Sequence, residues 1–528
     1  LSGLSFTDTL PAGITVATSG PTATCGGTLN TTAPGTVSFS GGTLGTTGPG
    51  NTCTINVTVT GAAIGMWNNT TGALSSTETG AGATSNTATL TVTPAPTMTT
   101  ITNAASLSGT PTVVGQPYAV NVSVNGGGIG APGTVTVSDG TGASCTITFN
   151  VNTDNPGSCS LTSTTAGAKT ITASYSGNTN FMGSSTTASH TVNKANTTLS
   201  NLTDAPDPSV VGQPYTAGFT LNVTAPGAGT PTGTVSVDDG AGGTCTATLP
   251  ATSCQLTSIV AGNKTVTFTY NGDGNFNASP SNTAGHAVNK ANTTVAITND
   301  TPDPSVIGQN YAVTVIVPVS SPGSGTPTGT ITVSDGTNSC TITLPGTACN
   351  LPSTSVGAKT LTATYSGDSN YNGSGPSAGV PHTVNKADVN VTITSDTPDP
   401  SALGQNVTVA FTVAAAAPGA GTATGNVTIT VAGGSETCTG ALAAGSGSCT
   451  LALTAAGDRT LTATYNGDAN FNSGTDTEPH TVVAPPQIAK VFNPGSAPVN
   501  ATTQLAVTIT NPAANTVALT GVGFTDNF

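Results

Sequence analysis

Short runs of alternating hydrophobic and polar residues follow one another along the chain. Residues 233–239, 246–251 and 264–270 show this period of two, and Gly, Pro, Asn or Asp residues separate the runs. A period of two places successive side chains on opposite faces of a strand, so each run predicts a short, half-buried β-strand. Turn residues about every ten positions are typical of a β-sandwich. We therefore predict an all-β protein.

The strand pattern itself repeats. The string APDPSVVGQPY starts at Ala205, TPDPSVIGQNY at Thr301 and TPDPSALGQNV at Thr397, a period of 96 residues, and a looser copy starts at Gly109. A second string closes each copy, as ASYSGNTNF, FTYNGDGNF, ATYSGDSNY and ATYNGDANF. Four tandem copies of this length indicate four similar domains. Connectors such as HTVNKA, from His190, contain no Gly/Ser linker, which predicts a stiff rod.

Each repeat has the size of an immunoglobulin-like β-sandwich of roughly seven strands. The motifs G-x-P-Y, then G-T-V-x-V-x-D-G, then A-G-x-K-T-x-T-x-x-Y-x-G-D-x-N-F resemble the bacterial Ig-like repeat domains of large surface proteins and adhesins. The resemblance covers residues 95–484 and implies tandem Ig-like sandwiches in a linear rod. It implies little about function, because such modules act as spacers in many contexts. The domains expected are residues 95–194, 195–290, 291–386 and 387–484.

The two ends of the chain belong to a different module. Residues 1–94, with FTDTLPAGI and SNTATLTVTP, resemble the conserved repeat domains of bacterial and archaeal surface proteins. Such domains open with strands like IAKVFNPGSAPVN and TQLAVTITNP, which here lie at the opposite end, within residues 485–528. Residues 519–528 (LTGVGFTDNF) also nearly repeat residues 1–10 (LSGLSFTDTL). We therefore expect a β-sandwich without its first strands at one end and the initial strands of a further domain at the other.

A sandwich that lacks strands leaves backbone N–H and C=O groups unpaired and an apolar face open to water. Two explanations are open. The chain is an excerpt from a longer periodic polypeptide, or the C-terminal strands of one subunit complete the N-terminal domain of its neighbour by strand addition. Both place the same contact head to tail. Since residues 1–10 and 519–528 cannot occupy one position, exchange leaves one of them to pair elsewhere.

The cysteines form one close pair in the N-terminal module and in each repeat. An even number at such spacing predicts disulfides. Zinc would need four converging ligands, and each repeat offers two Cys with its only His some 30 to 45 residues later. The short separations favour staples between neighbouring strands over the inter-sheet bridge of antibody domains. Disulfides persist in oxidising compartments, which predicts an extracellular or cell-surface location. The pairs are Cys25/Cys53, Cys145/Cys159, Cys245/Cys254, Cys340/Cys349 and Cys438/Cys449.

The composition and charge of the chain exclude some classes of binding partner. Charged residues make up 6% of the chain, and 8 Lys plus Arg against 22 Asp plus Glu give a net charge of −14. So few basic residues cannot neutralise phosphates, which excludes nucleic acid as a partner. No stretch reaches the roughly 18 apolar residues that a membrane helix needs. A secretion signal, if there is one, lies outside this segment.

A search for catalytic residues finds one histidine per repeat, always shortly before the connector. No G-x-S-x-G motif and no unpaired Cys accompanies these histidines, so their recurrence indicates shared architecture, and we expect no enzymatic activity. One tyrosine per repeat precedes the closing turn and is expected to anchor a late strand in the core. These residues are His190, His286, His382 and His480, and Tyr175, Tyr270, Tyr365 and Tyr465.

The closing turns alternate oxygen-bearing side chains and are candidates for calcium. Ca²⁺ takes six to eight oxygen ligands, however, and each turn supplies one carboxylate. A hairpin turn in which Asn and Asp bond their own backbone explains the same residues and is the favoured interpretation. No other cofactor is expected. The calcium candidates are Asp273, Asn275, Asp368, Asn370, Asp468 and Asn470.

These observations favour a secreted structural rod that is a subunit or segment of an extracellular filament and joins head to tail with further copies of itself by strand complementation. The first alternative is the passive stalk of a giant bacterial adhesin whose binding tip lies outside this segment. A carbohydrate-binding surface module is weaker, since Trp67 is the only Trp and no aromatic platform recurs. Glycans on Asn or Thr are further candidate partners, although Asn-x-Ser/Thr triplets arise by chance in this composition. Examples of such triplets start at Asn121, Asn196, Asn222, Asn292, Asn390 and Asn426.

Overall fold

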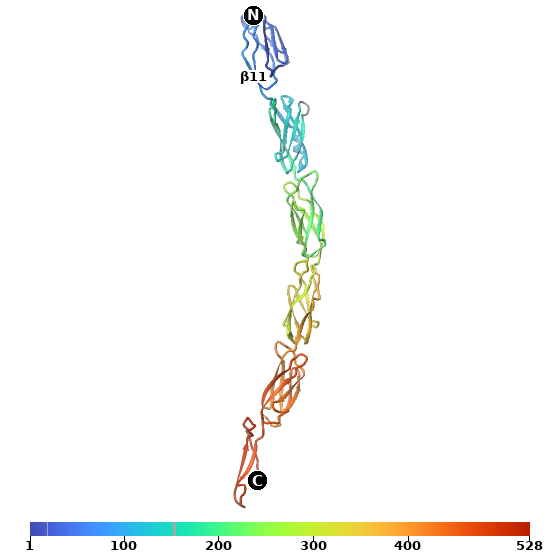
Figure 1. Ribbon diagram of the computed structural model, residues 1–528, viewed down its shortest axis with the longest axis vertical. Helices are drawn as coiled ribbons and strands as arrows, with labels where there is room; N and C mark the ends of the chain where they lie inside the picture. The colour runs from blue at the N-terminus through green and yellow to red at the C-terminus, as the bar shows by residue number, and fades with distance from the viewer. Residues whose placement is uncertain (18–19, 151–154, 528) are drawn as a thin grey trace.

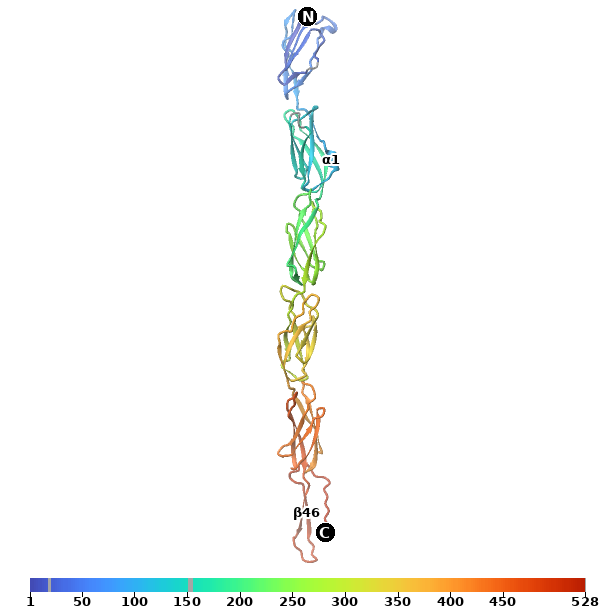
Figure 2. The same ribbon diagram turned by 90° about the vertical axis from the view of Figure 1, so that its right-hand side faces the viewer.

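The computed structural model describes residues 1–17, 20–150 and 155–527. Five β-rich units follow one another in a line, and a hairpin extends the rod at its C-terminal end (Figure 1). The view turned by 90° shows the same elongated shape (Figure 2). Within the described ranges the helical elements are α1 (Ala104–Gly109) and the 3-10 turn η1 (Gly48–Asn51), and no helix is long and apolar enough to cross a membrane. The predicted all-β fold of tandem sandwiches is confirmed.

Repeat 2 (residues 195–290) shows the plan that the repeats share. Three strands form one sheet in the order β21-β23-β26, and five form the other in the order β22-β28-β27-β24-β25. The ladders are antiparallel except that β22 runs parallel to β28. Alternate residues of both sheets point inward and form one core that includes Val235, Phe268 and Tyr270. The strands are β21 (Thr197–Ala205), β22 (Ser209–Val210), β23 (Pro214–Val223), β24 (Thr234–Asp238), β25 (Thr244–Thr248), β26 (Ser253–Thr257), β27 (Gly262–Tyr270) and β28 (Asn282–Asn289).

The other repeats follow this plan with small changes. Repeat 1 contains β12 (Thr97–Ile101), β13 (Thr112–Val113), β14 (Pro117–Gly126), β15 (Ile129–Gly130), β16 (Gly133–Ser138), β17 (Ser144–Phe149), β18 (Gly157–Thr162), β19 (Gly167–Tyr175) and β20 (Ser184–Asn193). Repeat 3 contains β29 (Ala296–Thr301), β30 (Ser305–Val306), β31 (Asn310–Ile316), β32 (Thr330–Ser334), β33 (Ser339–Thr343), β34 (Ala348–Pro352), β35 (Gly357–Tyr365) and β36 (Val380–Asn385). Repeat 4 contains β37 (Val389–Thr397), β38 (Ser401–Ala402), β39 (Asn406–Ala415), β40 (Asn426–Val431), β41 (Thr437–Ala441), β42 (Ser446–Ala452), β43 (Gly457–Tyr465) and β44 (Gly474–Val483).

Repeat 1 departs from the shared plan at α1. Repeats 2 to 4 carry an Asp-x-Pro-Asp-Pro motif, whereas repeat 1 has the sequence NAASLSGTP at residues 103–111. Ala and Leu favour a helix, and Leu107 packs into the core of repeat 1. The strand pattern did not predict this helix because six residues are too few to show a helical period.

The ten cysteines form five disulfides, and those of the repeats link the two sheets. The pairs are Cys25–Cys53, Cys145–Cys159, Cys245–Cys254, Cys340–Cys349 and Cys438–Cys449.

In repeat 2, Cys245 lies on β25 at the edge of the five-stranded sheet, and Cys254 lies on β26 at the edge of the three-stranded sheet. The prediction that the bridge would not join the sheets is therefore wrong. The short separation misled because the chain crosses from one sheet to the other between these consecutive strands.

The junctions between repeats use matching positions. Val114, Val211 and Ile307 each belong to one repeat and are buried in the hydrophobic core of the next. The backbone carbonyl of each also accepts a hydrogen bond of 3.1 to 3.2 Å from the next repeat. Because the same contacts recur, every junction has a similar geometry and the rod stays extended (Figure 1). The donors are the N–H groups of Ala228, Ser324 and Ala420.

The N-terminal module is divided into small sheets. One sheet has the order β10-β9-β1-β5-β4, and the remaining strands form the separate pairs β11-β8, β2-β7 and β3-β6. The strands are β1 (Leu4–Thr9), β2 (Ile14–Val16), β3 (Thr22–Ala23), β4 (Thr28–Thr32), β5 (Thr36–Gly42), β6 (Ile55–Asn56), β7 (Val59–Gly61), β8 (Gly65–Asn69), β9 (Ser75–Ser76), β10 (Gly80–Ala81) and β11 (Ala88–Val92). At the other end of the chain, β45 (Gln487–Asn493) and β46 (Gln504–Thr510) pair only with each other among the described strands.

Candidate functional site

The acidic turn of repeat 2 is held by its own backbone. Asp273 Oδ1 accepts the N–H groups of Asn275 and Phe276 at 2.7 and 2.8 Å, and Oδ2 accepts the N–H and the hydroxyl of Thr232, both at 2.7 Å. Burial alone would raise the pKa of Asp273, but these hydrogen bonds lower it to about 2. Asp368 and Asp468 have the same pattern, and their pKa values are also lowered to about 2.

The asparagine of the same turn reaches the preceding repeat. Asn275 Oδ1 accepts the N–H of Ala166 at 3.0 Å, and Asn370 Oδ1 accepts the N–H of Ala261 at 3.0 Å. The six calcium candidates thus lie together turn by turn, with carboxylates that already receive four donors each. This arrangement matches the favoured hairpin-turn interpretation and adds a role that sequence reasoning missed, the coupling of neighbouring repeats. Calcium binding at these turns is the less favoured alternative, and calorimetric titration with Ca²⁺ would test it.

The recurring histidines form the centre of a buried polar row. In repeat 2, His286 Nε2 lies 2.8 Å from Ser209 Oγ, and Nδ1 lies 2.7 Å from Asp204 Oδ2. The imidazole stacks on Tyr215 with ring centroids 3.8 Å apart. Asp207 Oδ1 lies 3.5 Å from Nδ1 and accepts the N–H of Ala287 at 2.9 Å.

This order of Ser, His and Asp is the hydrogen-bond order of a hydrolase triad. No sequence motif predicts this arrangement, because Asp204 and Ser209 lie in one short segment and His286 follows 77 residues after Ser209. A nucleophile must meet its substrate, however, and Ser209 is 0% exposed while the His286 side chain is also 0% exposed. The row is therefore placed as a polar element of the core, in agreement with the structural role expected for the histidine.

All four recurring tyrosines are buried, and three of them tie a late strand to a loop, whereas the hydroxyl of Tyr465 has no hydrogen-bond partner among the described residues. The hydroxyl groups of Tyr175, Tyr270 and Tyr365 donate to the carbonyl groups of Pro132, Thr232 and Thr328 at 2.6 to 2.7 Å. Burial raises the pKa of Tyr365 to about 12. Each of these three phenols is thus held neutral as a hydrogen-bond donor, which fits the anchoring role that the sequence predicts.

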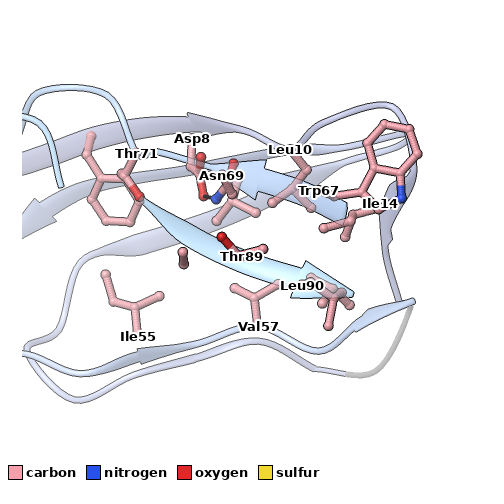
Figure 3. Close-up of a pocket in the computed structure, with 14 residues that line it drawn as sticks. Asp8, Leu10, Ile14, Ile55, Val57, Trp67, Asn69, Thr71, Thr89 and Leu90 are labelled. Atoms are coloured by element: carbon pink, nitrogen blue, oxygen red, sulfur yellow. Dashed lines mark hydrogen bonds between the residues drawn. The ribbon is translucent and has the colours of Figure 1, made fainter. Parts of the chain in front are cut away.

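The interior of the N-terminal module is open. A hollow of about 390 Å³ lies between its sheets, and a second of about 430 Å³ lies beside it, with Phe6 and Ile55 lining both. In the first hollow, Ile55 and Val57 lie across from Thr89 and Leu90, and Trp67 lies at one end (Figure 3). The walls are therefore largely apolar, as in a sandwich core that has not been filled.

The first hollow also contains unpaired polar atoms. Asn69 Nδ2 donates to Asp8 Oδ2 at 2.7 Å, while Oδ1 of Asp8 and Oδ1 of Asn69 are buried without a hydrogen-bond partner among the described residues. Buried acceptors without donors are unfavourable by roughly 1–3 kcal/mol each. A strand inserted here would bring backbone N–H groups within reach of such acceptors.

The C-terminal hairpin exposes an apolar face instead of enclosing an apolar hollow. Ile488 pairs with Ile509 and Phe492 with Leu505, so these four side chains share one face of the two-stranded ribbon. Ile488 is 50%, Phe492 50% and Ile509 42% exposed. A lone hairpin with an exposed apolar face is marginally stable in water. The ribbon therefore lacks a layer to pack on.

Sequence reasoning located these two ends but not their details. The displaced strand motifs predicted an unfilled module, and the hollows lie in it. The orphan acceptors of Asp8 and Asn69 could not be anticipated, because they depend on which side chains face each other across strands. The polar rows of the repeats left a partial signal, since the histidine recurs in all four repeats and the Asp-x-Pro-Asp-Pro motif recurs in repeats 2 to 4.

Comparison with known proteins identifies both modules. Residues 1–92 match a domain of unknown function, DUF7933. A search of curated protein sequences finds no match. The bacterial Ig-like domain (group 3) matches residues 105–193, 202–289, 297–385 and 393–484.

Solved structures give partial overlaps. A tetra-tandem repeat in the extending region of a large adhesion protein is 19% identical, with 74% of this chain and 99% of that chain covered and a TM-score of 0.32. Invasin, a bacterial integrin-binding protein, is 14% identical over 75% of this chain and 82% of its own, with a TM-score of 0.26. The Escherichia coli adhesin FdeC is 18% identical over 54% and 96%, with a TM-score of 0.19. On the family match, which spans most of the chain and confirms the resemblance seen in the repeats, this protein belongs to the bacterial Ig-like domain (group 3) family.

Proposed function

We propose that this chain is a non-enzymatic structural segment of an extracellular or cell-surface filament. The disulfides support an oxidising location outside the cytoplasm. The matched junctions support a rod that holds its ends apart, and length is then the function of the repeats. The partner that the filament needs is a further copy of the same chain, joined head to tail.

One observation supports this proposal: the N-terminal module contains apolar hollows, and the C-terminal hairpin has an exposed apolar face. The hollows of the module are lined by apolar side chains such as Val57 and Leu90, and the hairpin offers an apolar face that includes Ile488 and Ile509. Burial of apolar surface contributes roughly 25 cal/mol per Å², so filling the hollow with this face is favourable. Backbone groups of the added strands would pair with free edges in the module.

Association of the purified chain tests the proposal. We expect sedimentation velocity to show linear oligomers that grow with concentration. Ile509→Arg places a charge on the apolar face of the hairpin, and burying it is unfavourable by several kcal/mol, so the variant stays monomeric. Ile129→Arg is the matched control, because Ile129 is 57% exposed on repeat 1, and this variant associates as the parent does. A parent chain that remains monomeric at every concentration contradicts head-to-tail joining.

The alternative is a passive stalk in a longer polypeptide, in which the hairpin begins the next module of the same chain. The short, bonded junctions between the repeats suit a stalk equally well. Electron microscopy of native material separates the two functions. Regular polymers support the filament, whereas single beaded threads of fixed length support the stalk. Intact mass of the native protein gives an independent answer.

A further inference from the structure

Three repeats bring a histidine nitrogen and two carboxylates to one point. In repeat 2, Nδ1 of His286 and the carboxylates of Asp204 and Asp207 have ligand atoms within 4.8 Å of one another. The same trio occurs in repeats 3 and 4, as Asp300, Asp303 and His382, and as Asp396, Asp399 and His480. We propose that each trio is a binding site for a divalent transition-metal ion, with Zn²⁺ as the reference ion, which gives three sites in the described chain.

The donor atoms suit such an ion. Imidazole nitrogen and carboxylate oxygen both bind Zn²⁺, at about 2.0–2.2 Å. The Asp207 side chain is 41% exposed and that of Asp204 is 13% exposed, so the trio opens to solvent on the carboxylate side. An ion can enter from there, and water can complete its coordination. Two carboxylates also supply the negative charge that a dication needs.

The histidine ring is held in place by contacts on the side away from the carboxylates. Its second nitrogen, Nε2, lies 2.8 Å from Ser209 Oγ, and the ring stacks on Tyr215 with centroids 3.8 Å apart. Metal-binding histidines commonly have a hydrogen-bond partner at the other ring nitrogen, which fixes the ring. Asp207 is held as well, because its Oδ1 accepts the N–H of Ala287 at 2.9 Å. Two of the three ligands thus need little reordering.

Binding of the ion requires the other tautomer of the histidine. Nδ1 lies 2.7 Å from Asp204 Oδ2, a distance at which Nδ1–H donates to the carboxylate. The ion takes the lone pair of Nδ1 in the tautomer whose proton is on Nε2, where Ser209 Oγ, 2.8 Å away, can accept it, so the proton stays on the ring. Ligands of a tetrahedral ion stand about 3.3 Å apart at these bond lengths, and the Asp204 carboxylate must therefore shift outward by roughly half an ångström.

Repeat 1 is an internal control within the same chain. His190 Nδ1 lies 2.8 Å from the carbonyl oxygen of Leu107 in α1, and Nε2 lies 2.8 Å from Thr112 Oγ1. The segment of α1 replaces the Asp-x-Pro-Asp-Pro motif, so this segment offers no aspartate to the histidine. A backbone carbonyl that already accepts the Nδ1 proton offers no charge to a dication. Repeat 1 should bind no ion.

The test uses the full chain without a purification tag, freed of metal by a chelator. Titration calorimetry with Zn²⁺ and metal analysis after buffer exchange should both give three ions per chain. Asp207→Asn keeps the shape of the side chain and should reduce the count from three to two. Asp238→Asn alters an exposed aspartate of the same repeat and should leave three.

Loss of all binding in the triple variant Asp207→Asn, Asp303→Asn and Asp399→Asn completes the case, provided that its melting curve in chelator matches that of the parent. Should the triple variant fail to fold, the single variant still reports one site against the two that remain. The proposal is overturned if the parent binds no Zn²⁺ or if the single variant keeps three ions.

Discussion

At the residue scale, single side chains do several tasks in the closing turns. The carboxylate of Asp273 satisfies four donors within its own repeat, while Asn275 bonds the repeat before it. These two residues are two positions apart and look alike in sequence. Only the structure separates them, because the difference lies in which way each side chain points.

The three turn aspartates predict a dependence of stability on acid. Their pKa values are about 2 in the folded chain against an ordinary 3.8, so the ionised form stabilises the fold. This contribution is present above about pH 4 and is lost as the pH falls through about 2. We expect the melting temperature of the repeats to fall over this window. Changing Asp273, Asp368 and Asp468 to Asn together should lower stability at neutral pH and flatten the acid dependence.

A parallel change at exposed aspartates is the control for that measurement. Asp238→Asn and Asp388→Asn remove carboxylates on the surface, and the acid dependence should then match that of the parent. Calorimetry from pH 2 to pH 7 gives the melting temperature of both sets of variants. A triple turn variant that melts like the parent at every pH would contradict the role given to these carboxylates.

At the element scale, the alternation of side chains was enough to predict strands, and the repeat period was enough to predict domains. Strand order was beyond reach, because it depends on where the chain crosses between sheets. Cys245 and Cys254 show this most clearly: nine residues apart, they lie in different sheets. Helix α1 was not predicted for a related reason, since Leu107 packs in the core of repeat 1 but the helix is too short to show a helical period.

Removing the disulfide of repeat 2 should weaken the link between its sheets. Changing Cys245 and Cys254 together to Ala opens a short loop, and the loop-entropy estimate gives a loss of about 2–3 kcal/mol in the free energy of unfolding. Denaturant unfolding of the full chain should show a new transition at lower denaturant. Thr246→Ala, an exposed neighbour on β25, should leave the transitions in place. Unchanged unfolding of the double variant would show that the bridge contributes little.

At the scale of the whole molecule, the absence of linkers predicted a stiff rod, and the bonded junctions supply the physical cause. Each junction combines a buried aliphatic side chain with backbone hydrogen bonds across the boundary. The sequence could not reveal these contacts, because residues such as Val211 look like ordinary core positions of their own repeat. The displaced strands at the two ends were visible in the sequence because they match motifs of one domain.

The junction between repeats 2 and 3 can be loosened without touching either core. Asn370→Ala removes the hydrogen bond to the N–H of Ala261, worth about 0.5–1.5 kcal/mol, so the angle between these repeats should spread. Spin-label distances between repeats 2 and 3 should broaden. Asn470→Ala is the control, because the hydrogen bonds described for Asn470, with Asp468 and Ala387, both lie within repeat 4. Equal distance distributions in the parent and in Asn370→Ala would rule out this contact as a source of stiffness.

The parallel pairing of β22 with β28 has a mechanical meaning. In each repeat the short second strand runs parallel to the end of the last strand, near the exit of the chain, and these pairs are β13–β20, β22–β28, β30–β36 and β38–β44. Tension between the two termini would slide these strands past each other, and inter-strand hydrogen bonds lie across that direction. The bonds of a ladder would then share the load and break together instead of unzipping singly. Tension along the rod would therefore meet more resistance at these pairs than at strands that unzip one bond at a time.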